Sequence, residues 1–207
     1  MICYLLRHGK DDDTVRGGWC QNSLTEEGTA QAAEAAARIE KGNCGIRRIY
    51  SSDLPRAVET AAPVAEALRL QVISKAEFRE VNNGHLAGMP NVLAEQRYPG
   101  LYWNTLGWEQ QYPGGESPRE FCERITKAWD TFQQEIREAD ENVLLVTHGG
   151  VMQVILALVN GREYSNQKQL RKIGYTELIA LESRNGGWIE GAAIGRPHCT
   201  STLDGGE

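Results

Sequence analysis

The chain has 207 residues, 41% of them hydrophobic, and a formal net charge of −6. That length and apolar content suit one substantial core, so a single domain is favoured over two. The acidic balance, with no concentrated basic face, argues against nucleic acid or an anionic membrane as a partner. No apolar run reaches the length of a membrane span or of a signal-peptide core, so we expect a cytoplasmic protein.

The five cysteines give no sign of a metal site or a disulfide framework. They form no Cys-x-x-Cys pair, their number is odd, and they are Cys3, Cys20, Cys44, Cys122 and Cys199. Free, reduced thiols are therefore expected.

The chain opens with an apolar run, Ile2 to Leu6, that ends in Arg7, His8 and Gly9. Such a run is typical of a strand buried on both faces of a sheet. Ligand sites in open α/β sheets lie beyond the carboxyl ends of these strands, so Arg7 and His8 would stand at the mouth of a site. Taken alone, they fit equally well as the first surface residues after a strand.

A polar loop follows, with Asp11, Asp12 and Asp13 in a row. A solvated loop explains them better than a rim that attracts a cationic part of a substrate, although both interpretations are open. A helix is predicted after Leu24, because Thr25 can cap it and alanines continue to Gly42.

The next apolar segment, Ile46 to Tyr50, predicts a second strand, and the segment from Ser51 to Pro55 suits a helix start. Arg56 then lies in the first helical turn. An arginine there is either a surface residue or a ligand for phosphate, which backbone N–H groups at a helix start also bind.

Downstream of a short predicted strand, Gln71 to Ser74, Glu80 stands between an apolar segment and a glycine loop. Most glutamates in such places are solvated or cap a helix. From Met89 to Gly115 there is little helical or strand periodicity, but five aromatic residues occur there: Tyr98, Tyr102, Trp103, Trp108 and Tyr112. They suit a lid or binding wall, or equally a small satellite core.

The last third predicts a long amphipathic helix, a buried strand and a hairpin. Ser117 to Glu120 has the spacing of a capping box, and apolar residues continue at helical spacing to Ile136. The strand Asn142 to Thr147 runs into His148, Gly149 and Gly150, which repeats the device at the start of the chain. A helix over 151–159 and strands over 176–181 and 188–194 complete the domain, before a small-residue tail at 196–207 that we expect to be loosely held.

Six blocks in this order resemble the histidine phosphatase superfamily, in its phosphoglycerate mutase-like branch. They are Leu5-Leu6-Arg7-His8-Gly9, Leu24-Thr25-Glu26-Glu27-Gly28, the segment 50–57, Arg79-Glu80 ahead of Gly84 and Gly88, the segment 113–117, and Val146-Thr147-His148-Gly149-Gly150. The resemblance covers about residues 1–195, one domain with an aromatic-rich insertion at about 85–116. It implies a three-layer α/β/α sandwich with a mostly parallel central sheet.

The resemblance also implies roles for individual residues. His8 falls at the position of the nucleophile that receives the phosphoryl group, and Glu80 at that of the proton donor. Arg7, Arg56 and a protonated His148 surround the phosphoryl oxygens, with N–H groups such as that of Gly149 at a helix start. Cationic side chains of this kind replace a metal, so neither a metal nor another cofactor is expected.

Two blocks depart from the family pattern. Where relatives usually carry an acidic or amide residue after Arg-His-Gly, and often an asparagine a few positions later, this chain has Lys10 and the run Asp11 to Thr14. Ala87 stands where many relatives have a glutamate.

A metal-independent phosphatase acting on a small phosphorylated metabolite fits the sequence best. A mutase must hold a carboxylate and a second phosphate, and the only cations between His85 and Glu116 are His85 and Arg97. A cofactor-dependent phosphoglycerate mutase-type phosphotransferase is the alternative. An inactive binding relative is the third reading, disfavoured because all five reactive positions are filled. Whether the protein forms a homodimer is left open.

Overall fold

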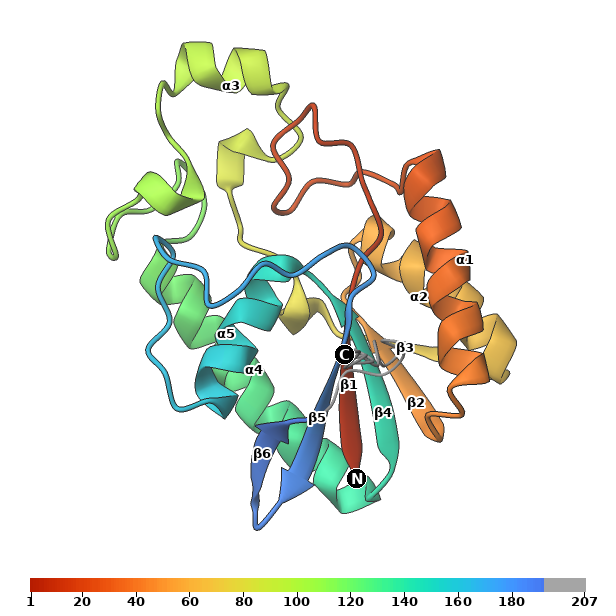
Figure 1. Ribbon diagram of the computed structural model, residues 1–207. Helices are drawn as coiled ribbons and strands as arrows, with labels where there is room; N and C mark the ends of the chain where they lie inside the picture. The colour runs from red at the N-terminus through yellow and green to blue at the C-terminus, as the bar shows by residue number, and fades with distance from the viewer. Residues whose placement is uncertain (192–207) are drawn as a thin grey trace, which may run out of the picture.

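The structure is a computed structural model that describes residues 1–191. A six-stranded sheet with the order β3-β2-β4-β1-β5-β6 lies at its centre (Figure 1). Four strands run parallel, whereas the last two are antiparallel to their neighbours. The strands are β1 Ile2–Arg7, β2 Ile46–Ser51, β3 Val72–Ser74, β4 Asn142–Thr147, β5 Leu178–Arg184 and β6 Gly187–Glu190. The predicted α/β architecture with a mostly parallel sheet is confirmed.

Helices cover both faces of the sheet and make the outer layers of the sandwich. Helices α1 Glu26–Lys41 and α2 Pro55–Leu68 lie on one face, and α4 Pro118–Ala139 and α5 Gly149–Val159 on the other (Figure 1). Because side chains alternate along a strand, Tyr4 and Leu6 pack in the core under the first pair and Cys3 and Leu5 in the core under the second. The opening strand is therefore buried on both faces, as its sequence predicts.

The predicted capping residues are confirmed at the starts of α1 and α4. The Thr25 side chain accepts the N–H of Gly28 at the start of α1, and Ser117 and Glu120 form the capping box of α4. Helix α2 begins with Pro55 and has no side-chain cap, so a small capping residue is not used there. This helix continues through Pro63 to Leu68.

The predicted hairpin joins β5 and β6. Asn185 and Gly186 have φ angles of 50° and 79°, the left-handed values that a two-residue type I′ turn requires. Strand β6 ends at Glu190, and the predicted continuation over 192–194 lies outside the described residues, as do the predicted tail and Cys199. Cys3, Cys20, Cys44 and Cys122 are free thiols.

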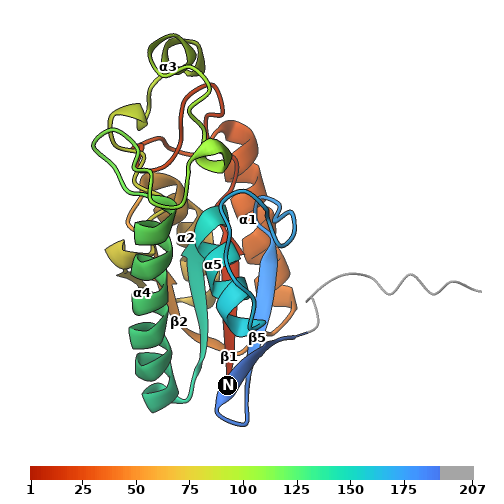
Figure 2. The ribbon, with the colours of Figure 1, turned by 90° about the vertical axis from the view of Figure 1, so that its left-hand side faces the viewer.

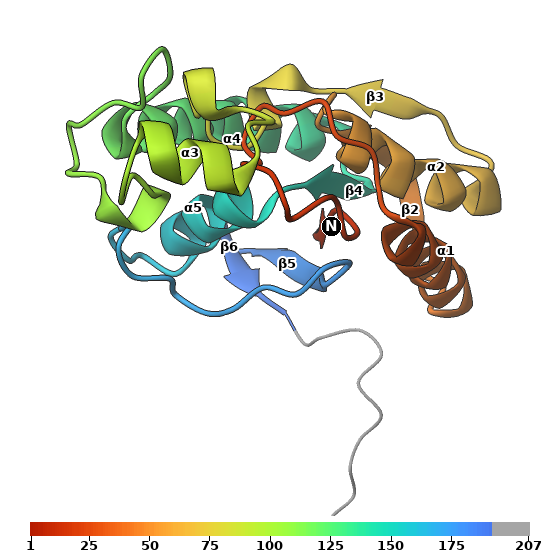
Figure 3. The ribbon, with the colours of Figure 1, turned by 90° about the horizontal axis from the view of Figure 1, so that it is seen from above.

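The insertion contains a helix that the sequence did not predict, α3 Asn91–Arg97. Only Ala94 in it is buried, and Val92 is 73% exposed, so the segment lacks the apolar periodicity by which a helix is recognised. The insertion and the loop that follows β1 lie together beyond the carboxyl ends of the parallel strands (Figures 2 and 3). Among residues 1–191, no helix has the length and apolar character needed to cross a membrane.

Candidate functional site

His8 directly follows β1 and is only 5% exposed. Its Nδ1 lies 2.7 Å from the carbonyl oxygen of Gly9. Because a carbonyl only accepts, Nδ1 carries the proton and Nε2 is left with a free lone pair. Burial, followed by the charges of Arg56 and Arg7, holds the pKa of His8 well below the usual 6.5. The ring is therefore a neutral imidazole with an available nucleophilic nitrogen.

His148 follows β4, the strand next to β1, and its ring centroid lies 5.1 Å from that of His8. Its Nε2 lies 2.9 Å from Ser52 Oγ, whereas its buried Nδ1 has no hydrogen-bond partner within residues 1–191. Burial and the charge of Arg56 lower the pKa of His148 well below 6.5. In the absence of an anion, the imidazole of His148 is therefore favoured in its neutral form. A bound anion would favour the charged ring.

Arg56 lies in the first turn of α2 and is 1% exposed. Its Nη1 donates to the carbonyl of Cys20 at 3.3 Å and its Nη2 to that of Gly18 at 2.7 Å. The Asp11 carboxylate approaches Nε at 3.4 Å, with a side chain that is 13% exposed. A solvated loop is therefore the wrong interpretation for Asp11, although Asp12 and Asp13 are exposed.

Arg7 closes the other side of the site. Its Nη1 donates to the carbonyl of Ile173 at 2.7 Å, and its guanidinium stacks 4.1 Å from the centre of the Tyr175 ring. Nε of Arg7 is buried and has no partner among the described residues. Gly149, the first residue of α5, lies beside this Nε, so the start of that helix and the guanidinium meet at one point.

Glu80 is held at the N-terminus of α5. One carboxylate oxygen accepts the N–H of Gly150 and the other that of Val81, both at 3.0 Å. A Cβ at position 150 would stand 2.3 Å from Glu80, so only glycine allows this approach. The Glu80 carbonyl in turn accepts from Trp19 Nε1 at 2.7 Å and from Arg124 Nη2 at 3.0 Å. Both the side chain and the backbone of Glu80 are fixed.

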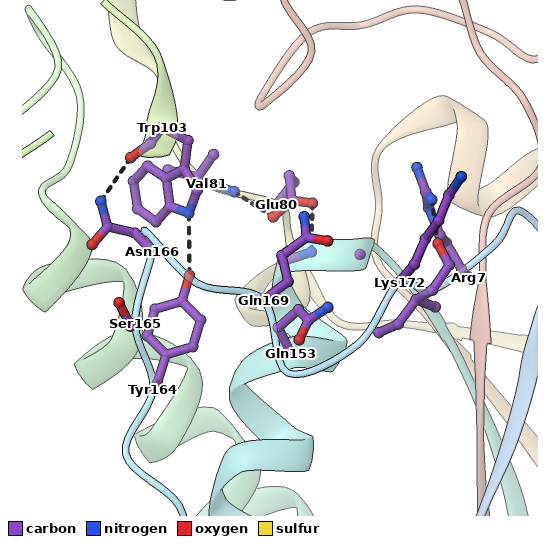
Figure 4. Close-up of a pocket in the computed structure, with 13 residues that line it drawn as sticks. Arg7, Glu80, Val81, Trp103, Gln153, Tyr164, Ser165, Asn166, Gln169 and Lys172 are labelled. Atoms are coloured by element: carbon purple, nitrogen blue, oxygen red, sulfur yellow. Dashed lines mark hydrogen bonds between the residues drawn. The ribbon is translucent and has the colours of Figure 1, made fainter. Parts of the chain in front are cut away.

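A cavity of about 500 Å³ adjoins these groups (Figure 4). Arg7 and Glu80 line one part of it, and Trp103 and Tyr164 line another. The remaining lining residues are Val81, Gly149, Gly150, Gln153, Ser165, Asn166, Gln169, Lys172 and Ile173. The volume suits a small organic group.

Much of this wall comes from the segment between α5 and β5, which sequence reasoning missed. Gln153 of α5 holds that segment by accepting the N–H of Leu170 and donating to the carbonyl of Arg171. The segment has no helical or strand period, so no pattern assigns it to the site. It also brings a cation, Lys172, which lines the same cavity as Arg7.

The aromatic insertion serves both predicted purposes. Tyr112 is buried with Leu86 and Leu106 in a satellite core, on which Trp103 packs while it also lines the cavity. Tyr102 and Trp108 are among the exposed large side chains. Neither His85 nor Arg97, the cations found there in the sequence, lines the cavity.

Four of the predicted site residues therefore meet at the ends of β1, β4 and the start of α2: Arg7, His8, Arg56 and His148. Glu80 shares the adjoining cavity with Arg7. Within residues 1–191, no group of three or more His, Cys, Asp or Glu side chains is arranged to hold a metal ion.

Comparison with known proteins identifies the family of this chain. Residues 3–192 match the family described as the histidine phosphatase superfamily (branch 1). A 2,3-bisphosphoglycerate-dependent phosphoglycerate mutase of Bartonella bacilliformis is 28% identical over 170 residues, covering 76% of this chain and 80% of the relative. A probable phosphoglycerate mutase of Escherichia coli O139:H28 is 27% identical over 205 residues, covering 90% and 89%.

Among solved structures, a mycobacterial glucosyl-3-phosphoglycerate phosphatase superposes with a TM-score of 0.75 at 26% identity, over 93% of this chain and 98% of that one. The family match spans nearly all of the residues that the structure describes. It includes both strand-end histidines, both arginines and Glu80. The chain belongs to the histidine phosphatase superfamily, branch 1.

Proposed function

We propose that this protein is a phosphatase that hydrolyses a small phosphomonoester through a phosphohistidine formed on His8. The observation that carries the proposal is the state of His8, a buried neutral imidazole whose Nδ1 proton is held by Gly9. The guanidiniums of Arg56 and Arg7 lie near enough to His8 for their charges to lower its pKa. A nucleophile and a set of cations at one point are what transfer of a phosphoryl group requires.

In the first step His8 Nε2 forms a bond to phosphorus while the ester P–O bond breaks. Glu80, in its protonated form, gives its proton to the departing oxygen. Charge on the phosphoryl oxygens is stabilised by Arg7 and Arg56 and by His148, which the incoming anion helps to protonate. These side chains supply the positive charge that a metal ion supplies in other phosphoryl-transfer enzymes.

In the second step water attacks phosphorus as the P–N bond breaks. Glu80, now a carboxylate, takes the proton of the water, and His8 returns to its neutral state as phosphate leaves. One carboxyl thus serves as acid and then as base, so the difficult hydrolysis is divided into two easier steps.

The cavity favours an uncharged leaving group with hydroxyl or aromatic character. The Tyr164 hydroxyl accepts a hydrogen bond from Trp103 Nε1, and the Ser165 hydroxyl accepts one from the N–H of Gln167. The O–H of each can still donate to a bound group. Glu80 is the only carboxylate among the lining residues. A positively charged leaving group would meet Lys172 and Arg7 there, which opposes its binding.

The second candidate is a phosphoglycerate mutase-type phosphotransferase. Lys172 favours it, because this lysine gives the cavity a cation that could hold a carboxylate or a second phosphate. The curated relatives named above bear mutase names. Against it, Lys172 is the only cation in the lining besides Arg7, whereas a mutase has to retain a bisphosphorylated intermediate.

The test compares release of inorganic phosphate from 3-phosphoglycerate with its conversion to 2-phosphoglycerate, beside a panel of neutral phosphomonoesters. We expect release to exceed isomerisation, with the highest kcat/KM on a neutral ester and no loss of rate with chelator. Isomerisation much faster than release, stimulated by a bisphosphoglycerate primer, would establish the mutase. Activity lost with chelator and restored by magnesium or zinc would overturn metal independence.

A further inference from the structure

Asp11 lies beside Arg56, one of the cations that would bind the phosphoryl group in the proposed site. Its carboxylate lies 3.4 Å from Nε of Arg56, and both side chains are largely withdrawn from solvent, at 13% and 2% exposure. The two terminal nitrogens of Arg56 donate to backbone carbonyls, whereas Nε has no hydrogen-bond partner within residues 1–191. Nε is therefore one N–H of Arg56 at which Asp11 and a phosphoryl oxygen would compete.

The charged groups around Asp11 come from three elements. Arg56 of α2 and Arg7 of β1 favour the carboxylate, and Asp12 of the same loop opposes it. Lys10 does not help, because its ammonium bonds Glu27 of α1 at 2.6 Å. On α2, Glu59 accepts the N–H of Leu24, the residue whose backbone bridges to Asp11.

Burial outweighs the attraction of the arginines. It raises the pKa of the Asp11 carboxyl above the usual 3.8, although Arg56 alone would lower it. A phosphoryl dianion arriving beside Arg56 adds repulsion between like charges, which raises the pKa further. Protonation removes that repulsion and turns Asp11 into an O–H donor toward the anion.

We propose that Asp11 takes up one proton from solvent when a phosphoryl dianion binds beside Arg56. The inference rests on the proposed function, since it places the phosphoryl group at this arginine. Above the pKa that Asp11 has in the ligand-free protein, uptake of this proton makes the affinity for a dianion fall about tenfold for each rise of one pH unit. Below that pKa the carboxyl of Asp11 is already neutral, so Asp11 no longer contributes to the pH dependence of the affinity.

The experiment measures sulfate binding by calorimetry at neutral pH, in buffers of different ionisation heat, which gives the number of protons taken up. Sulfate is tetrahedral and stays a dianion over the working range, so every proton goes to the protein. Asp11→Asn keeps the shape and offers an N–H donor without a charge. Asp13→Asn, an exposed position on the same loop, is the matched control.

We expect wild-type protein and Asp13→Asn to take up about one proton more than Asp11→Asn. Proton uptake by His148 is common to all three and cancels in the difference. Asp11→Asn should also bind sulfate about tenfold more tightly than wild type one pH unit above the pKa of free Asp11. Asp11→Ser, if folded like the wild type, should lose the extra proton as well.

Equal proton uptake in wild type and Asp11→Asn would overturn the inference and leave the proposed function standing. Should Asp11→Asn and Asp11→Ser both fail to fold, the wild-type protein decides by itself. For wild-type protein we would then fit proton uptake and sulfate affinity against pH. If a single ionising group explains both curves, with no second group needed, the result contradicts the role of Asp11. Failure of wild-type protein to bind sulfate, phosphate or vanadate would count against the phosphoryl site itself.

Discussion

Burial of the two strand-end histidines sets the protonation state in which each meets a substrate. Because the pKa of His8 lies well below 6.5, this proposed nucleophile stays neutral as the pH falls through that value. The acid limb of kcat/KM should therefore lie below pH 6.5, once the ionisation of the ester itself is allowed for. The measurement is kcat/KM against pH with p-nitrophenyl phosphate. An acid limb at or above 6.5 would contradict a buried, neutral His8.

Glu80 is the second residue whose role can be isolated. A leaving alkoxide needs a proton, whereas nitrophenolate departs without one. General acid help is typically about 10²- to 10⁴-fold, so Glu80→Gln should slow phosphorylation by alkyl phosphates by about that factor. The loss with p-nitrophenyl phosphate should be much smaller in the same step, measured as the pre-steady-state burst of nitrophenol.

Because Glu80 is also the proposed base of the second step, steady-state rates alone could hide this contrast. Glu77→Gln, an exposed position three residues earlier, is the matched control and should leave both rates unchanged. Equal losses for alkyl and nitrophenyl esters in the burst step would remove Glu80 from the role of acid.

At the scale of single residues, the sequence predicted which residues form the site better than it predicted their protonation and burial. The order of the motif blocks pointed to Arg7, His8, Arg56 and His148, and the structure brings these four together. The sequence could not predict that burial lowers the pKa of His148, or that the Asp11 carboxylate lies against Arg56. Burial is a property of the packed chain, and a run of three aspartates shows the same local pattern whether or not one of them turns inward.

Among the elements, α4 does more than cover the sheet. Its Arg124 donates to the carbonyls of Glu77, Arg79 and Glu80 and pairs with the Glu116 carboxylate at 2.7 Å. The helix therefore fixes the backbone that carries the proposed acid. If Glu80 is the acid that we propose, Arg124 positions it and is a positioning residue.

Replacing Arg124 by Met should cost about 2–3 kcal/mol of unfolding free energy, because the Glu116 carboxylate loses its ion pair and the three carbonyls lose a charged donor. Activity on alkyl phosphates should fall more than activity on p-nitrophenyl phosphate, as for Glu80→Gln. Arg124→Lys should recover part of both. The measurements are urea unfolding and the ratio of kcat/KM for the two ester types. An unchanged ratio would limit Arg124 to a structural role.

Elements with a strong period were predictable, and those without one were not. The alanine-rich α1 and the amphipathic α4 carry their own caps, so their starts could be placed to the residue. Helix α3 exposes most of its surface and has no such period. The segment between α5 and β5 is irregular as well, which is why the wall containing Tyr164 and Lys172 was missed.

For the whole molecule, the pattern of apolar runs and the expected parallel sheet together predicted most of the fold and the position of the site. Two strands with continuous apolar runs, each ending in histidine and glycine, had to lie side by side in a parallel sheet for the site to form. They do so, since β1 pairs with β4 and Arg7 pairs with Thr147. The shape of the adjoining cavity could not be predicted from the sequence, because it depends on how three segments that are distant in the chain pack together.

The central claim is that His8 becomes covalently phosphorylated, and trapping the intermediate tests it most directly. Wild-type protein mixed briefly with ³²P-labelled substrate and quenched in alkali should carry an acid-labile, alkali-stable label on His8. His85→Ala, which removes an exposed histidine from the insertion, should retain both label and turnover. His8→Ala should lose both. A labelled adduct and undiminished turnover in His8→Ala would contradict the account.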